Sequence, residues 1–171
     1  VEVTRGTDPN DPQSKPSYVA GDFDGDGKSD LATYSAASGL WDIRSSATGG
    51  FLQRQFGWSA ADPVPADYDG DGLCDEAVYH PEGGTWYIRS SATGGALSQP
   101  FGWVDAVPVP ADYDGDGRAD VAVYHPLTGT WYILQSSNNQ VLTRQFGWSA
   151  ALAVPADYDN DGKADLAVYY P

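Results

Sequence analysis

Aspartates recur along this chain in a fixed pattern that suits ion binding. Four nine-residue segments carry Asp at positions 1, 3, 5 and 9 and Gly at position 6, as in DYDGDGRAD at 112–120. The segments begin at Asp22, Asp67, Asp112 and Asp157, so each starts 45 residues after the one before. Four carboxylates within nine residues repel one another strongly unless a cation lies among them. The pattern therefore predicts four loops that each hold a metal ion.

Hard oxygen ligands at alternating positions, with a glycine that permits a sharp turn, are typical of calcium loops. Position 4 is Gly in three segments and Asn160 in the fourth. Both residue types tolerate positive φ, which favours a left-handed turn there. The residue type at position 7 varies among the loops, as expected if only the backbone carbonyl of this residue binds the ion. We therefore predict about four Ca²⁺ ions, one in each loop. The predicted carboxylate ligands are Asp22, Asp24, Asp26, Asp30, Asp67, Asp69, Asp71, Asp75, Asp112, Asp114, Asp116, Asp120, Asp157, Asp159, Asp161 and Asp165, and the predicted carbonyl ligands are Lys28, Leu73, Arg118 and Lys163.

The residues after each loop exclude two other calcium-binding arrangements. An EF-hand needs a bidentate Glu at position 12, where this chain has Thr33, Val78, Val123 and Val168. The segments that follow the loops, such as VAVY, favour short strands over helices. Nonapeptide β-roll repeats are excluded because the period is 45 and not 9.

The elements around the loops repeat with them, over 17–61, 62–106, 107–151 and a partial copy at 152–171. In the third copy we expect strands near 107–110, 121–124, 130–134 and 141–146, because apolar or β-branched residues there are separated by Pro and Gly turns. Four short antiparallel strands per fixed period are typical of a propeller blade. The predicted fold is all-β: a β-propeller-like array of four-stranded antiparallel blades with a period of 45 residues and an incomplete last blade.

The strand that leaves each loop is largely apolar on both faces, which suits a strand enclosed by neighbouring blades. In the third copy Val121 and Val123 form one face, and Ala122 and Tyr124 form the other. Glu76 breaks this pattern in the second copy. We therefore expect that face of the second blade to reach solvent or a partner.

The loop together with Phe-Gly pairs resembles the FG-GAP/VCBS-type repeats of integrin-α-like β-propellers. The Phe-Gly pairs begin at Phe56, Phe101 and Phe146, whereas SAADPVPAD or VDAVPVPAD stands where the Gly-Ala-Pro half would be. The resemblance covers about residues 17 to 171, and the loop is its most specific part. It implies a calcium-stabilised all-β fold in an extracellular or cell-surface setting, and it names no ligand.

Residues 1–16 lie outside the repeats. Residues 1–5, VEVTR, alternate like a short strand, and the segment from Thr7 to Pro16 has the composition of a linker. This strand is a candidate to complete the partial last blade, either within one chain or across to the next molecule by β-augmentation. Repeated head to tail without closure, the second arrangement builds a filament. A third possibility is that the chain is a segment of a longer array, in which neighbouring repeats supply the missing strands.

The six Trp residues form two series with the same 45-residue spacing. The first is Trp41, Trp86 and Trp131, and the second is Trp58, Trp103 and Trp148. Large apolar side chains at fixed positions are expected to pack between blades. The alternative is a row of sugar-stacking platforms, for which Trp86 and Trp131 are the candidates.

Composition excludes several classes of function. The formal charge is −15, yet sixteen of the 24 acidic residues lie in the loops, and four bound Ca²⁺ would leave about −7. Nine scattered Lys and Arg residues do not form a basic patch, so nucleic acid is not an expected partner. No long apolar run indicates a membrane span. The single cysteine, Cys74, has no partner for an internal disulfide, so the loops are expected to act as the staples.

These observations favour a non-enzymatic, extracellular, calcium-stabilised β-repeat protein. No G-x-S-x-G, HExxH or phosphate-loop motif indicates catalysis. We expect a structural or adhesive role, with self-assembly head to tail as one form of it. The alternative is a lectin-type propeller that binds glycans between blades. The expected partners are accordingly copies of the chain itself, or glycans or proteins of the cell surface or matrix.

Overall fold

The computed structural model describes residues 19–171. The strand and linker predicted for residues 1–16 lie outside this part of the chain. Nearly all regular structure in the described part is β-strand, with one 3₁₀ turn, η1, at Pro81–Gly83. The strands are β1 (Leu31–Ser35), β2 (Leu40–Arg44), β3 (Phe51–Gln55), β4 (Asp62–Pro63), β5 (Glu76–His80), β6 (Thr85–Arg89), β7 (Ala96–Pro100), β8 (Val107–Pro108), β9 (Val121–His125), β10 (Thr130–Leu134), β11 (Val141–Gln145), β12 (Leu152–Ala153) and β13 (Val168–Tyr169).

The strands pair antiparallel in chain order. They form the sheets β1-β2-β3, β4-β5-β6-β7, β8-β9-β10-β11 and β12-β13. The predicted all-β antiparallel fold is confirmed, and the four strands predicted in the third repeat differ from β8 to β11 by at most two residues at any end. Closure of the sheets into a propeller stays a prediction. No helix in the described residues has the length and apolar character that a membrane span requires.

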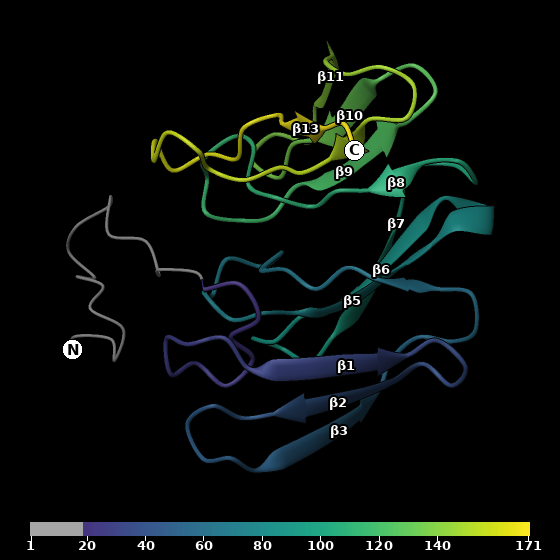
Figure 1. Cartoon of the computed structure of the whole chain (residues 1–171). Coiled ribbons are helices and arrows are strands. Elements are labelled where there is room, and N and C mark those ends of the chain that lie inside the picture. The colour runs from purple at the N-terminus through teal and green to yellow at the C-terminus, as the bar shows by residue number, and fades with distance from the viewer. Residues whose placement is uncertain (1–18) are drawn as a thin grey trace.

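The Asp-rich segments lie on one side of this array. Figure 1 shows the sheets following one another from β1–β3 to β8–β11, with the segments that join each short first strand to the second gathered at the same edge. The second, third and fourth of these segments contribute to the lining of a groove of about 960 Å³ whose walls include Ala66, Ala111 and Ala156. Loops that are 45 residues apart in the sequence are therefore neighbours in space.

In each repeat with a Phe-Gly pair, the pair packs against the turn that joins the second and third strands and hydrogen-bonds to it. Gly84, in the turn between β5 and β6, has a positive φ of 56°, and a Cβ there would lie 2.3 Å from the carbonyl oxygen of Gly102. The Phe101 N–H donates to the Gly84 carbonyl at 2.8 Å. Only glycine permits both this backbone conformation and this close approach. The repeated Phe-Gly signal thus has a packing role.

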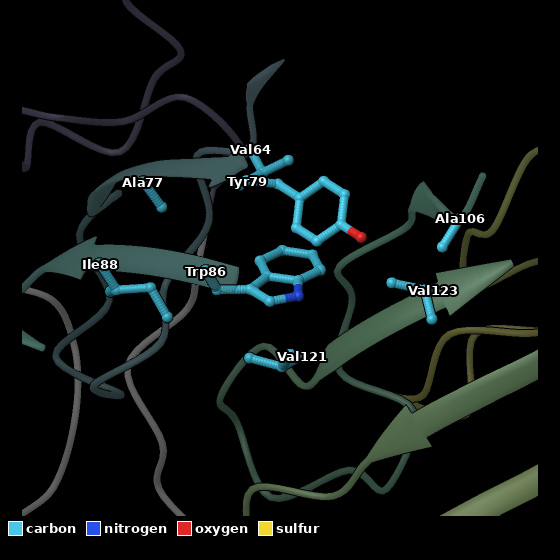
Figure 2. Close-up of a cluster of buried hydrophobic side chains, with 8 residues drawn as sticks. All are labelled: Val64, Ala77, Tyr79, Trp86, Ile88, Ala106, Val121 and Val123. Carbon is cyan, nitrogen blue, oxygen red and sulfur yellow. The ribbon is translucent and has the colours of Figure 1, made fainter. Parts of the chain in front are cut away.

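The core lies between consecutive sheets. Figure 2 shows Tyr79 and Trp86 of the sheet β4–β7 pointing toward Val121 and Val123 of β9 in the next sheet. Trp86 is completely buried, and its indole Nε1–H donates to the Phe101 carbonyl at 2.8 Å. Burying an indole while satisfying its only donor gives a large apolar filler without an unpaired polar group. Corresponding clusters surround Trp41 and Trp131.

Candidate metal centre

The first aspartate of each loop organises the loop backbone. In the second repeat, Asp67 Oδ1 accepts the Gly70 N–H at 2.6 Å and its Oδ2 accepts the Gly72 N–H at 2.8 Å. The residue at position 4 has a positive φ, which is 82° at Gly70 and 62° at Asn160. The left-handed turn predicted from Gly and Asn at this position is confirmed. The loop therefore curls around its own leading carboxylate.

The ninth residue fastens the loop to the same repeat's outer hairpin. Asp75 is completely buried, and its Oδ2 accepts the Tyr68 N–H at 2.7 Å while its Oδ1 accepts the Ser91 N–H at 2.7 Å. Asp120 makes the same pair of contacts with Tyr113 and Ser136. Because Ser91 and Ser136 lie in the turns after β6 and β10, this carboxylate joins the loop to the second half of its sheet.

Serine hydroxyls from that turn hold two further carboxylates, a contact that the aspartate pattern did not reveal. Ser90 Oγ donates to Asp69 Oδ2 at 2.6 Å, and Ser91 Oγ donates to Asp71 Oδ2 at 3.0 Å. In the first repeat the same contacts run from Ser45 to Asp24 and from Ser46 to Asp26. The signal was present in the sequence, because SSATGG occurs at 45–50 and again at 90–95. Only the folded chain shows that this segment forms a turn that closes on the loop.

Carboxylates of each loop converge closely enough to share one ion. In every loop three of them offer oxygens that all lie within 4.8 Å of one another. The converging sets are Asp22, Asp24 and Asp30; Asp67, Asp69 and Asp71; Asp112, Asp114 and Asp120; and Asp157, Asp159 and Asp165. The fourth aspartate of each loop, Asp26, Asp75, Asp116 or Asp161, falls outside these sets.

The donor set fits a calcium ion. It consists of carboxylate oxygens alone, and each ionised carboxylate keeps lone pairs beyond those that accept loop N–H groups. The residues predicted to offer carbonyls lie beside the loop aspartates, since the N–H groups of Lys28, Leu73, Arg118 and Lys163 each donate to the position-5 carboxylate at 2.7 to 2.9 Å. Only in the second loop does that carboxylate, Asp71, belong to the converging set. A bound Ca²⁺ would neutralise the clustered charge and fix the loop that joins the first and second strands of the repeat.

Burial makes these negative charges costly without a cation. Burial raises the pKa of Asp67 from its ordinary value of 3.8 to about 6, and it raises the pKa of Asp120 to about 6 as well. Burial also raises the pKa of Asp75. At exposed Asp24 the hydroxyl of Ser45 lowers the pKa instead. The buried carboxylates thus lie where a proton or a cation relieves the loss of solvation.

Comparison with known families agrees with the geometry of these loops. Residues 112–168, which include the third and fourth loops and the strands between them, match the FG-GAP-like repeat family model. The all-β repeating structure of the other described residues fits a protein of FG-GAP/VCBS-like repeats. Neither the curated proteins nor the solved structures include one that matches this chain.

Successive loops of the array touch one another directly. The N–H of the residue at position 8 donates to the carbonyl of the position-1 aspartate in the preceding loop. These bonds run from Cys74 to Asp22 at 2.7 Å, from Ala119 to Asp67 at 2.6 Å and from Ala164 to Asp112 at 2.7 Å. Position 8 is also where the single cysteine lies, and Cys74 is buried with 3% of its surface exposed. A small residue there lets neighbouring loops approach.

The interpretation of Trp86 and Trp131 as sugar-stacking platforms is wrong. Both indoles have 0% exposure because the next sheet covers them, so neither ring face is available to a ligand. The second series lies closer to solvent, with Trp58 38% and Trp148 52% exposed. Trp58 packs edge-on against Tyr87 of the following repeat, with ring centroids 4.7 Å apart. These tryptophans bridge repeats while leaving part of the ring exposed.

Proposed function

We propose that this chain is a calcium-stabilised, non-enzymatic scaffold of β-repeats that works outside the cell in a structural or adhesive role. The observation that carries the proposal is the convergence of three carboxylates in each of four loops, repeated at a spacing of 45 residues. The FG-GAP-like match at 112–168 supports the role, because this family is generally structural or adhesive and typically extracellular.

Calcium in this scaffold has a conformational task. Each loop joins the first strand of a repeat to the second, and through Asp75 or Asp120 it also holds the outer hairpin. Extracellular calcium modules often have dissociation constants of order 10⁻⁴ to 10⁻³ M, so they fill outside cells and empty inside them. The array would therefore become rigid only after it reaches the calcium-rich exterior.

Calcium titration followed by chelation tests this proposal. At 1 mM Ca²⁺ and a dissociation constant near 10⁻⁴ M, each site adds about 1.4 kcal/mol, and four sites add about 6 kcal/mol. We expect calorimetry to find about four ions per chain and a Tm lower by roughly 10 to 20 °C in a chelator. Addition of excess Mg²⁺ is the control and should restore little of that loss. A chain that takes up no calcium at physiological salt would contradict the proposal.

We further propose that the scaffold associates head to tail with copies of itself. Val154, Tyr158 and Tyr169 of the last described repeat are 39%, 64% and 57% exposed. The residues that correspond to Tyr158 and Tyr169 in the third repeat, Tyr113 and Tyr124, are 9% and 1% exposed. The sheet β12-β13 of this repeat has only two strands, whereas the preceding sheets have three or four. Its open edge is a ready acceptor for a strand of another chain, and such a strand would help to cover the exposed apolar side chains.

The opposite end of the array favours strand exchange over face-to-face contact. On this face the first repeat has Thr33, Asp42 and Arg44 where the third repeat has Val123, Tyr132 and Leu134, and Leu31, 71% exposed, is its apolar member. A largely polar face such as this one is favourably solvated by water. It would lose that solvation if it packed against the apolar face of the last repeat in another copy. The donor in this proposal is therefore the strand predicted in residues 1–16.

Truncation tests the assembly. Sedimentation velocity of the chain in calcium, with and without residues 1–6, should show larger species only for the longer form. Monomers in both preparations would remove the assembly proposal and leave the calcium proposal intact.

A glycan-binding role is the second candidate, and the partly exposed tryptophans favour it. Trp58 and Trp148 each present part of an indole at the surface of the array. Similar sites repeated along one chain would give multivalent binding. A glycan array in millimolar Ca²⁺ should then show binding that is lost on Trp58→Ala and kept on Trp86→Phe, which changes only a buried ring. Binding that Trp58→Ala leaves unchanged would contradict this role.

A further inference from the structure

The backbone hydrogen bonds between successive loops link the candidate calcium sites to one another. Asp67 has two tasks at once: its carboxylate belongs to the second loop, while its carbonyl accepts the Ala119 N–H of the third loop at 2.6 Å. Ala119 is followed directly by Asp120, a carboxylate of the third loop's own converging set. Ordering the second loop therefore fixes the Asp67 carbonyl, which holds the backbone of the third loop next to its candidate ion ligand Asp120.

Side chains add a second contact between the second and third loops and between the third and fourth loops. An ideal Cβ on Gly70, at position 4 of the second loop, would lie 3.1 Å from Arg118 Cγ of the third loop. A Cβ on Gly115 would lie 2.9 Å from Lys163 Cε of the fourth loop. The position-7 side chain of each later loop thus lies across the turn of the loop before it. Consecutive loops share a backbone bond and a packing contact, and the chain offers this arrangement twice.

We propose that calcium binds cooperatively along the array, with each loop raising the affinity of the loops directly beside it. The inference rests on the proposed calcium function and adds how the sites are coupled. Binding orders a loop, and a neighbour that is already ordered lowers the entropy cost of ordering the next. A backbone hydrogen bond has a net value that corresponds to a roughly 3- to 10-fold change in affinity. We expect a coupling of that size between adjacent loops.

Each loop contains its own reporter for this coupling. The glycine at position 6 donates its N–H to the position-1 carboxylate, at 2.8 or 2.9 Å in all four loops. Its amide resonance should move when the carboxylate takes up an ion. Calcium titration of the ¹⁵N-labelled full chain, followed at Gly27, Gly72, Gly117 and Gly162, therefore gives the midpoint of every site separately.

A single charge removal in one loop tests whether the coupling passes between neighbours. Asp114→Asn keeps the side-chain shape and an acceptor for Ser137 but removes one carboxylate from the third loop. We expect Gly72 and Gly162 to need roughly 3- to 10-fold more calcium, with Gly27 unchanged. The matched control is Asp24→Asn in the first loop, which should shift the midpoint of Gly72 and leave that of Gly162 in place.

The outcomes separate this inference from the function on which it rests. Midpoints of the neighbouring loops that are the same in wild type and in both variants overturn the coupling. An equal shift at Gly27 in Asp114→Asn also overturns it, because that result indicates general loosening of the array. If calcium moves none of the four glycine resonances in the wild-type chain, the calcium proposal itself fails.

Discussion

Two junctions between sheets use the same backbone frame and different side chains. At the junction of β1–β3 with β4–β7, the Tyr34 hydroxyl donates to the Trp58 carbonyl at 3.0 Å. At the junction of β4–β7 with β8–β11, the Tyr79 hydroxyl donates to the Trp103 carbonyl at 2.9 Å. Both junctions also have the bond between neighbouring loops, at 2.7 and 2.6 Å. The hydrogen-bonded parts of the two junctions are therefore the same.

The facing strands differ. At the first junction Glu76 lies between Arg54 of the preceding repeat and Arg89 of its own, at 3.4 and 3.1 Å. Its side chain is only 12% exposed. The prediction that this face reaches solvent or a partner is wrong, because Arg54 of the preceding repeat covers Glu76 and pairs with it within the same chain. At the second junction the corresponding residues are Gln99, Val121 and Leu134, and Val121 and Leu134 belong to the apolar cluster around Trp86.

The contrast shows which contacts the repeat requires. The Asp-rich loops, the Tyr-to-Trp bonds and the buried indoles recur, so they set the spacing and orientation of neighbouring sheets. The strand that faces the preceding sheet, β5 or β9, needs only to fill the remaining space. It does so with apolar side chains at one junction and with the ion triad of Arg54, Glu76 and Arg89 at the other. Because desolvation offsets much of the Coulomb energy of such a triad, it contributes less to stability than to matching these two repeats with each other.

The largest expected effect concerns the buried loop carboxylates, which belong to the part of the structure that both junctions share. In the calcium-free chain, the pKa of Asp67 and of Asp120 lies near 6, above the ordinary 3.8. A raised folded-state pKa gives stability that is complete below pH 3.8 and is lost as the pH rises through 6. The free energy of unfolding should thus be about 2 to 3 kcal/mol greater at pH 5 than at pH 7.

Thermal melts in a chelator at the two pH values measure this difference. In saturating calcium the direction should reverse, because protons then compete with the ion for the carboxylates. A calcium-free chain that loses stability between pH 7 and pH 5 would contradict the assignment of buried, uncompensated loop carboxylates.

The second prediction concerns the apolar junction alone. Val123 is completely buried beside Trp86, whereas Thr33 holds the corresponding place in the first repeat and is exposed. Val123→Thr should lower the free energy of unfolding by about 1 to 2 kcal/mol, because it buries a hydroxyl. Thr33→Val is the matched control and should change stability little. Urea denaturation measures both, and equal effects would show that the junction does not exclude water.

The smallest effect is expected at the ionic junction. Glu76→Ala leaves Arg54 and Arg89 without their shared carboxylate, which should cost about 1 kcal/mol because both side chains are partly exposed, at 42% and 28%. Replacing all three residues with those of the other junction, as Arg54→Gln, Glu76→Val and Arg89→Leu, should restore or exceed the original stability. A triple variant less stable than Glu76→Ala would mean that the junctions are not interchangeable, and denaturant midpoints decide it.

The sequence determined the repeat, its strands and the loops as candidate sites. Short runs of apolar and β-branched residues between Pro and Gly turns located β9 and β10, and the 45-residue period located the corresponding β5 and β6. The Asp spacing identified the converging carboxylates, and Asn160 identified the left-handed turn, because both depend on residues within one loop. Contacts that lie within nine residues can be inferred from the chain itself.

Tertiary structure alone decided the contacts between distant segments. Serine turns close on the loops from about 20 residues away, successive loops bond across 52 residues, and Trp86 is buried by a sheet that the pattern could not orient. Identical spacing made the two Trp series equivalent in the sequence, and only sheet packing separated buried from exposed. Sequence periodicity fixes which residues repeat, whereas the relative placement of the sheets depends on the packing energy of many side chains acting together.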